Sequence, residues 1–243
     1  MKIWITVPTF NRKKIAEVSL KQLCNHKGAH TLHVSDDWST EYSPNIFEQF
    51  SDQVEKVPRK MGIHHLRCWE FRKFLNERSE DLLYMTDSDT VHDPNFADRL
   101  IELYKFKYPT TIYNTQHHFN SSLPRHLLEQ YCPETLNHGA ILRRTMPGVS
   151  QLFDREMVTK IVNYLDSEGD PVYAWDYRVI ECLRTPCVTS NISFLEHFGG
   201  PGSIHNKTLD TDRAYNPTEY LKSIRPIVID YLNSDKTIND LNI

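Results

Sequence analysis

Two acidic residues one position apart follow an apolar run, in the triplet Asp87-Ser88-Asp89. On an extended or turning segment, both carboxylates can face one divalent ion while Ser88 points away. Oxygen ligands suit Mg²⁺ or Mn²⁺, and a metal held there can clamp a diphosphate and neutralise the charge that develops as it leaves. A solvated turn is the alternative, because Asp, Ser and Thr are common turn residues. The triplet by itself favours the turn.

Two further strand-like runs end in polar residues. The run at residues 2–7 leads into Pro8-Thr9-Phe10-Asn11-Arg12, and the run at residues 30–35 leads into Asp36-Asp37. Ligands of open α/β sheets bind in the crevice beyond the carboxyl ends of the strands. We therefore expect these two segments and the Asp87-Ser88-Asp89 triplet to line one nucleotide pocket.

The elements that must position these residues alternate between strand-like and helix-like patterns, which predicts an α/β fold with a central, mainly parallel sheet flanked by helices. The expected strands are residues 2–7, 30–35, 54–57, 81–86, 110–115, 139–143, 149–153 and 188–195. The expected helices are residues 12–26, 44–50, 62–77, 96–104, 155–167, 175–184 and 217–232. Within the last of these, Pro226 predicts a kink or a break.

Composition excludes several classes of protein. Hydrophobic residues make up 39% of the 243 residues and charged residues 25%, as in ordinary globular proteins. The net charge of -4 is spread without a basic block, so we expect no nucleic-acid partner. Five cysteines without an apolar leader indicate reduced thiols in a cytoplasmic protein, and no stretch is long and apolar enough for a transmembrane segment.

Four ordered motifs resemble the family 2 type of GT-A glycosyltransferases over most of the chain. They are Val7-Pro8-Thr9-Phe10-Asn11-Arg12, Asp36-Asp37-Trp38-Ser39-Thr40, Gly62-Ile63-His64-His65-Leu66-Arg67 and Met85-Thr86-Asp87-Ser88-Asp89. Their order and spacing are more specific than any one of them. The resemblance implies a GT-A fold and a transfer of sugar from a nucleotide diphosphate.

The resemblance also implies roles for individual residues. Pro8, Thr9, Phe10, Asn11 and Arg12, with Asp36 or Asp37, would contact the nucleobase and ribose; Arg67 would lie near the nucleotide; Asp87, Ser88 and Asp89 would lie at the ribose and metal. The sequence departs from the family at Trp38, where glycine is usual, and at Cys68, where asparagine is common. Lys60-Met61-Gly62 replaces the family's Asn-x-Gly element, and uridine is the first choice of base.

An inverting transfer needs a general base for the acceptor hydroxyl, and a carboxylate is the usual one. Tyr173-Ala174-Trp175-Asp176-Tyr177-Arg178 resembles the family's base site, with Asp176 as the base and Trp175 in place of the customary glutamate. Alternatively, Asp176 is a capping or first-turn carboxylate stabilised by the helix dipole. Asp154 and Asp170 are the competing bases.

A glycine-rich segment at residues 197–205 follows the last expected strand, and such segments are often functional. GT-A enzymes often take a third metal ligand from a histidine in this region, which the resemblance assigns to His197, with His205 as the second choice. A lone histidine is more often structural than a ligand.

We therefore expect one GT-A domain spanning residues 1–243, with a nucleotide-sugar half (1–115), an acceptor and catalytic half (116–205) and a helical tail (206–243). Its expected activity is Mn²⁺- or Mg²⁺-dependent, inverting transfer from a UDP-sugar to a hydroxyl of a glycan or glycoprotein. The alternatives are a nucleotidyltransferase of the same fold and a catalytically silent sugar-nucleotide or glycan-binding domain. The missing glycine-rich turn after the first strand argues against the former, and intact Asp87, Asp89 and Asp176 argue against the latter.

Overall fold

The computed structural model describes residues 1–26, 28–115, 139–199 and 213–243. Within these ranges an eight-stranded sheet forms the centre of the molecule, in the order β3-β2-β1-β4-β8-β6-β9-β7. Its strands are β1 (Ile3–Thr9), β2 (Thr31–Asp36), β3 (Gln53–Lys56), β4 (Leu82–Thr86), β6 (Thr110–Thr111), β7 (Ala140–Arg143), β8 (Ser150–Asp154) and β9 (Cys187–Ser190). Four neighbouring pairs are parallel and three are antiparallel. The prediction of a mainly parallel α/β sheet is confirmed.

Strand β1 is buried along its whole length, which explains its continuous run of apolar and β-branched residues. It pairs in parallel with β2 on one side and β4 on the other. The register places Thr9 opposite Asp36 and Thr6 opposite Met85. The three polar segments that follow these strands therefore meet at one edge of the sheet.

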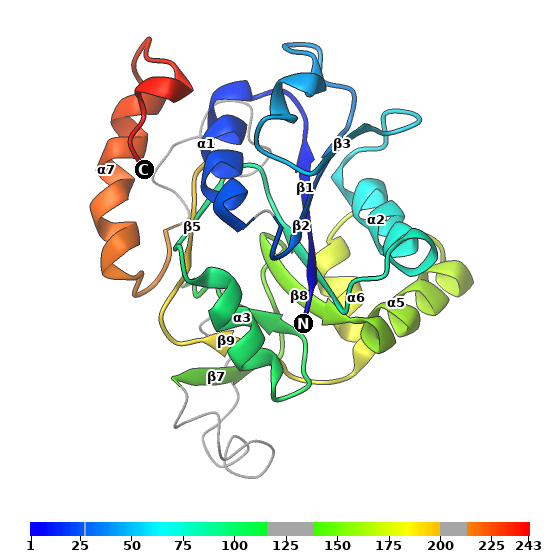
Figure 1. The fold of residues 1–243 in the computed structure, drawn as a ribbon. Coiled ribbons are helices and arrows are strands. Elements are labelled where there is room, and N and C mark those ends of the chain that lie inside the picture. Colours follow the sequence, from blue (N-terminus) through cyan, green and yellow to red (C-terminus); the bar gives the residue numbers. More distant parts are fainter. Residues whose placement is uncertain (27, 116–138, 200–212) are drawn as a thin grey trace.

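Helices cover both sides of the sheet, with α1, α3 and α7 to the left of the central strands in Figure 1 and α2, α5 and α6 to the right. The α-helices are α1 (Lys13–Leu23), α2 (Ile63–Glu77), α3 (Phe96–Tyr104), α5 (Arg155–Glu168), α6 (Trp175–Leu183) and α7 (Glu219–Leu232); short 3₁₀ turns occupy Cys24–His26, Pro44–Phe47 and Ile238–Asp240. Helix α2 packs on the sheet through aromatic contacts, Phe71 against Phe153 and Phe74 against Trp4. These contacts fix the helix that carries Arg67.

Two of the expected strands were wrong. The strand expected at 188–195 is two strands, because residues after Ser190 leave the main sheet and β10 (Leu195–His197) pairs antiparallel with β5 (Thr90–His92) in a second sheet. Strand β5 was not predicted at all. The strand expected at 110–115 covers only Thr110–Thr111. Of the kink or break expected at Pro226, the break is absent: helix α7 continues through Pro226, which lies on an exposed face where water can bind the freed carbonyl.

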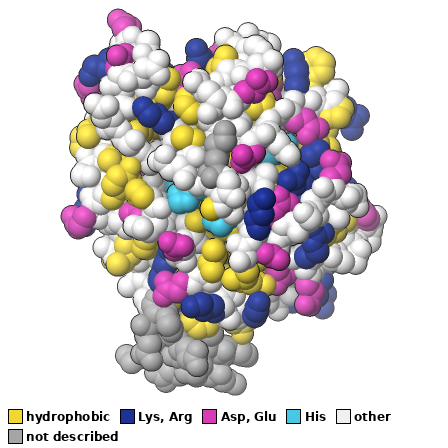
Figure 2. All heavy atoms as spheres, viewed as in Figure 1, with side chains coloured by type: hydrophobic (Ala, Val, Ile, Leu, Met, Phe, Trp, Pro, Cys, Tyr) yellow, Lys and Arg dark blue, Asp and Glu magenta, His cyan; other side chains and the backbone are white. Residues whose placement is uncertain are grey.

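The surface and the cysteines show two further features. Acidic and basic side chains are interspersed over the face seen in Figure 2, without a broad patch of one sign. The four cysteines of the described segments are free thiols, and burial raises the pKa of Cys68 to about 12 and that of Cys182 to about 11. None of the helices in these segments is long and apolar enough to cross a membrane.

Candidate active site

The Asp87-Ser88-Asp89 triplet forms the turn between β4 and β5. The hydroxyl of Thr90 donates to the carbonyl of Asp87 at 2.7 Å and closes the turn. The hydroxyl of Thr86 donates to the carbonyl of Val149 at 3.0 Å and ties the end of β4 to its neighbouring segment. The turn is therefore anchored at both ends, which fixes the direction of its side chains.

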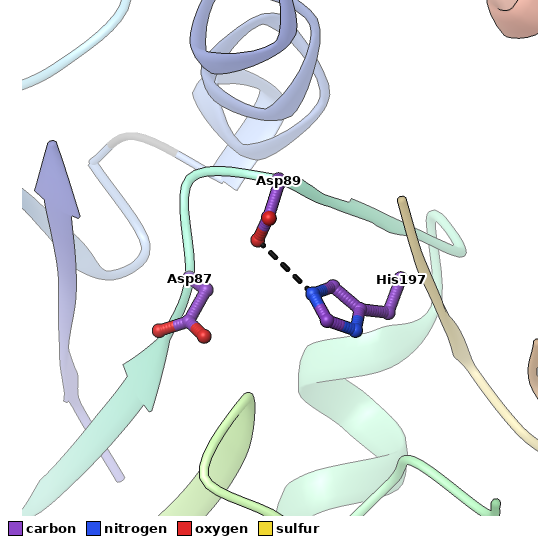
Figure 3. A group of neighbouring side chains, drawn as sticks. All are labelled: Asp87, Asp89 and His197. Carbon is purple, nitrogen blue, oxygen red and sulfur yellow. Dashed lines mark ion pairs between the residues drawn. The ribbon is translucent and has the colours of Figure 1, made fainter. Parts of the chain in front are cut away.

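His197 reaches this turn from the second sheet. The register of β10 on β5 places His197 opposite Thr90, and the amide of Phe198 donates to the carbonyl of Asp89 at 2.8 Å. The imidazole Nε2 lies 3.3 Å from Asp89 Oδ1, and the two side chains point toward each other in Figure 3. One ligand atom from each of Asp87, Asp89 and His197 lies within 4.8 Å of the others.

These three side chains form a donor set of two carboxylates and one imidazole, in which Asp89 and His197 are buried and Asp87 is half-buried. Carboxylate oxygens suit Mg²⁺ and Mn²⁺, and imidazole is a common ligand of divalent transition metals. Although burial disfavours the charged form, His197 and Arg12 lower the pKa of Asp89 to about 2. The carboxylate is thus ionised at neutral pH, as a metal ligand must be.

Arg12 binds the same cluster from the start of α1. Its guanidinium donates to Asp89 Oδ2 at 2.7 Å and to the carbonyl of Gly199 at 2.6 Å. Beside it, a hollow of about 660 Å³ is bordered by the loop before α1 and the end of α7. Arg12 therefore both lines this hollow and contacts the acidic cluster.

The loop that follows β1 and the loop that follows β2 are joined by hydrogen bonds. The side-chain carbonyl of Asn11 accepts from the amide of Thr40 at 2.8 Å, and the amide of Asn11 donates to Ser39 Oγ at 2.8 Å. The amide of Arg12 donates to Glu41 Oε2 at 2.9 Å. The loop of Pro8 to Arg12 thus has a defined position relative to the loop after β2.

Asp36 and Asp37 are both buried and both hydrogen-bonded. Asp36 accepts from the amide of Ser39 at 3.0 Å and from the hydroxyl of Thr9 at 3.2 Å. Asp37 accepts from the amides of Met61 and Gly62 at 2.6 and 2.8 Å, which fixes the segment that enters α2. Each carboxylate keeps acceptor capacity beyond these bonds, because two oxygens offer about four lone-pair sites.

Arg67 is fully buried in α2 and points toward the triplet. Its guanidinium donates to Asp87 Oδ1 at 2.6 Å and to the carbonyl of Thr86 at 2.7 Å. A third bond joins Arg67 to Glu70 Oε2 at 2.8 Å. Sequence reasoning found Arg67 through its motif but missed Glu70, because charged positions on an amphipathic helix are expected to face solvent.

Asp176 lies in the first turn of α6, next to Gly148. A Cβ at Gly148 would lie 3.3 Å from Asp176 Oδ2, so the absence of a side chain there lets the two segments approach. Burial raises the pKa of Asp176, and backbone amides, including those of Tyr177 and Gly148, oppose this rise. The competing residues have other partners: Asp154 caps α5 and Asp170 forms an ion pair with Arg72.

Strained backbone gathers at these loops. Among the described non-glycine residues, seven have positive φ, and Asn11, Arg12, Trp38 and Ala174 belong to the segments that carry the predicted site residues. Left-handed backbone is uncommon outside glycine and costs most for bulky side chains such as that of Trp38. Such strain persists where surrounding contacts impose it, often at functional sites.

A family model described as glycosyl transferase family 2 matches residues 4–162 of the chain. The chain belongs to this family. Two crystal structures of S. aureus TarS have a similar fold at 14% identity. The first, of TarS, has a TM-score of 0.59, and the match covers 99% of the present chain and 41% of the TarS chain. The second, of TarS 1-349, has a TM-score of 0.55, and the match covers 99% of the present chain and 68% of the TarS 1-349 chain.

The glycosyltransferase therefore spans about two fifths of the longer TarS chain. A search of curated protein sequences found no match. The predictions of a GT-A fold and of a glycosyltransferase are confirmed.

The backbone of Trp38 bears on one departure noted in the sequence. Trp38 stands where the family usually has glycine, and its φ is 67°, in the region that favours glycine. Its indole N–H donates to the carbonyl of Val57 at 2.8 Å, and the ammonium of Lys56 lies 4.5 Å from the ring centroid. These contacts offset part of the backbone cost. His205, the second choice for the metal, lies outside the described residues.

Proposed function

We propose that this glycosyltransferase moves a sugar from a UDP-linked donor to a hydroxyl of a glycan or glycoprotein acceptor, with inversion at the anomeric carbon and with Mn²⁺ or Mg²⁺ at Asp87, Asp89 and His197. The convergence of these three side chains at the carboxyl edge of the sheet supports the proposal most directly. When bound, such a cation would neutralise charge on the leaving diphosphate. We propose that residues 1–243 act as one domain with the three parts expected above.

In the proposed reaction the acceptor oxygen forms a bond to the anomeric carbon as the bond from that carbon to the diphosphate oxygen breaks. The acceptor proton passes to the carboxylate of Asp176, and the electron pair of the broken bond leaves with the nucleotide diphosphate. A raised pKa suits Asp176 to this role, because it makes the carboxylate a better proton acceptor.

In the same proposal, the loop of Pro8 to Arg12 holds the nucleoside, and Asp36 or Asp37 accepts a hydrogen bond from the uracil imide N–H. Ser88 borders the ribose, and Arg67, which is fully buried, acts near the nucleotide by holding Asp87. The hydrogen bonds between the first two loops support this arrangement, because they hold both loops in place before a ligand arrives.

The test is nucleotide release from a panel of UDP-, CDP-, GDP- and dTDP-sugars, with Mn²⁺, with Mg²⁺ or with EDTA. We expect release from a UDP-sugar only with a divalent cation. Asp89→Ala should abolish release and keep the fold, whereas Asp98→Ala, which removes an exposed carboxylate from α3, should behave as the parent does. Full activity of the parent in EDTA would refute the metal assignment.

A further inference from the structure

Glu70 is a fully buried carboxylate in the middle of α2. Its Oε1 accepts from the hydroxyl of Thr6 in β1 and, at 2.5 Å, from the hydroxyl of Ser35 in β2. Its Oε2 accepts from Arg67 at 2.8 Å. An ionised carboxylate is costly to bury unless it is paired and hydrogen-bonded, and Glu70 satisfies both conditions with groups from three elements.

The partner of Glu70 is the arginine that holds Asp87. One terminal nitrogen of Arg67 donates to Glu70, and the other donates to Asp87 Oδ1 at 2.6 Å and to the carbonyl of Thr86 at 2.7 Å. The planar guanidinium is a rigid fork, so a carboxylate on one prong fixes the direction of the other. The guanidinium also lies 5.5 Å from the ring centroid of Trp175, the residue before Asp176.

The charge of Glu70 matters for any cation at Asp87. Arg67 carries a permanent positive charge next to this carboxylate and would repel a divalent ion. Glu70 neutralises that charge from the far side of the guanidinium, which leaves Asp87 with its negative potential. At short range in a buried setting such charges interact strongly, because little water screens them.

We infer that Glu70 is a positioning residue for the metal centre, which acts through Arg67 by orienting Asp87 and by cancelling the charge of the guanidinium. This inference rests on the proposed function. Removing the direct hydrogen-bond partner of a metal ligand typically lowers metal affinity by about 10- to 100-fold. Arg67 is that partner for Asp87, and Glu70 lies one contact further out, behind Arg67. Glu70→Gln retains the shape of the side chain and an oxygen for Thr6 and Ser35, but it removes the charge.

The experiment titrates Mn²⁺ into the protein in the presence of UDP and counts free Mn²⁺ by electron paramagnetic resonance, with thermal melting as a second measurement. We expect Glu70→Gln to weaken Mn²⁺ binding by about tenfold, the lower end of the range for direct partners of metal ligands, because Glu70 acts through Arg67. Glu80→Gln is the matched control, because Glu80 is also buried and paired with an arginine, Arg78, at 2.7 Å. The control should lower the melting temperature and leave Mn²⁺ affinity unchanged.

A second variant, Arg67→Lys, keeps the positive charge but loses the fork that spans both carboxylates, and it should also weaken Mn²⁺ binding. It tests the same link if Glu70→Gln does not fold. If a folded variant of the two binds Mn²⁺ as tightly as the parent does, the ion pair of Arg67 and Glu70 is only structural, and the inference is overturned. A parent that binds UDP and Mn²⁺ would at the same time leave the proposed function standing, whereas a parent that binds neither would overturn both.

Discussion

Replacing Asp176 by asparagine tests whether Asp176 is a general base or a helix-capping residue. Asparagine keeps the shape of the side chain beside Gly148 but cannot accept the proton of the acceptor hydroxyl. Removal of a general base typically lowers the rate by about 10² to 10⁴, which corresponds to about 2.7 to 5.4 kcal/mol of activation free energy. We expect Asp176→Asn to lose transfer by this factor while donor affinity and melting temperature stay near those of the parent.

The chain offers a matched control in Asp154, a carboxylate that caps a neighbouring helix. Its side chain accepts from the amide of Met157 at 2.8 Å and from the hydroxyl of Tyr104 at 2.8 Å. Asp154→Ala should cost about 0.5 to 2 kcal/mol of stability, or roughly 1 to 8 °C in melting temperature for a chain of this size. Its transfer rate at a temperature below both transitions should match that of the parent.

The assay pairs nucleotide release from an active donor with differential scanning fluorimetry of the same samples. The pH dependence of transfer is a further test. A general base must be deprotonated, so activity is lost on acidification, and the raised pKa of Asp176 places the midpoint of that loss at a higher pH than is usual for an aspartate. If Asp176→Asn retains transfer within a few fold and instead melts at a lower temperature, Asp176 is a structural carboxylate and the reasoning fails.

Three further outcomes are expected. Uracil has an imide N–H that cytosine lacks, so UDP should bind about tenfold or more tightly than CDP if Asp36 or Asp37 reads the base; equal affinities by calorimetry would contradict this. Gly148→Ala should lower the transfer rate with little change in UDP affinity, because the methyl group would lie 3.3 Å from Asp176 Oδ2. Burial lowers the pKa of His92 to about 3, so on acidification the unfolded chain binds this proton near pH 6.5 and the folded chain only near pH 3, and stability falls as the pH falls through that window. By pH 4.5 the loss is about 3 kcal/mol, and urea midpoints that decline equally in His92→Gln would rule out His92 as the cause.

The fold could be predicted from the sequence where local signals agree with long-range pairing. The runs that became β1 and β4 are mostly apolar, the run that became β2 has Leu32 and Val34 at alternate positions, and each run is followed by a polar segment, so both their type and their C-terminal edge were readable. The second sheet was not readable, because β5 and β10 have three residues each and exist only through pairing with each other. Short segments carry little periodicity, and their pairing depends on how the whole chain is folded.

In the candidate site, too, some residues could be predicted from the sequence and others could not. Asp87 and Asp89 were predicted from the ordered motifs and His197 from the resemblance of its glycine-rich segment to the family's third-ligand region. The structure places the three side chains close together although the histidine lies far from the two aspartates in the sequence. Glu70 carried no such signal, because a glutamate on an amphipathic helix ordinarily faces water. The left-handed backbone of Trp38 was hidden for a similar reason, since tryptophan rarely adopts it.

The two aspartates of the triplet are held in different ways, and this bears on how a cation would bind. Asp87 is held by Arg67, which Glu70 neutralises from behind. Asp89 is held by Arg12, whose guanidinium contacts Asp89 Oδ2, an oxygen that could otherwise bind the cation. A cation would thus find Asp87 already oriented but would have to compete with Arg12 for Asp89. A nucleotide diphosphate supplies anionic oxygens that can bind both Arg12 and the cation, so we expect the cation to bind weakly alone and more tightly with the nucleotide.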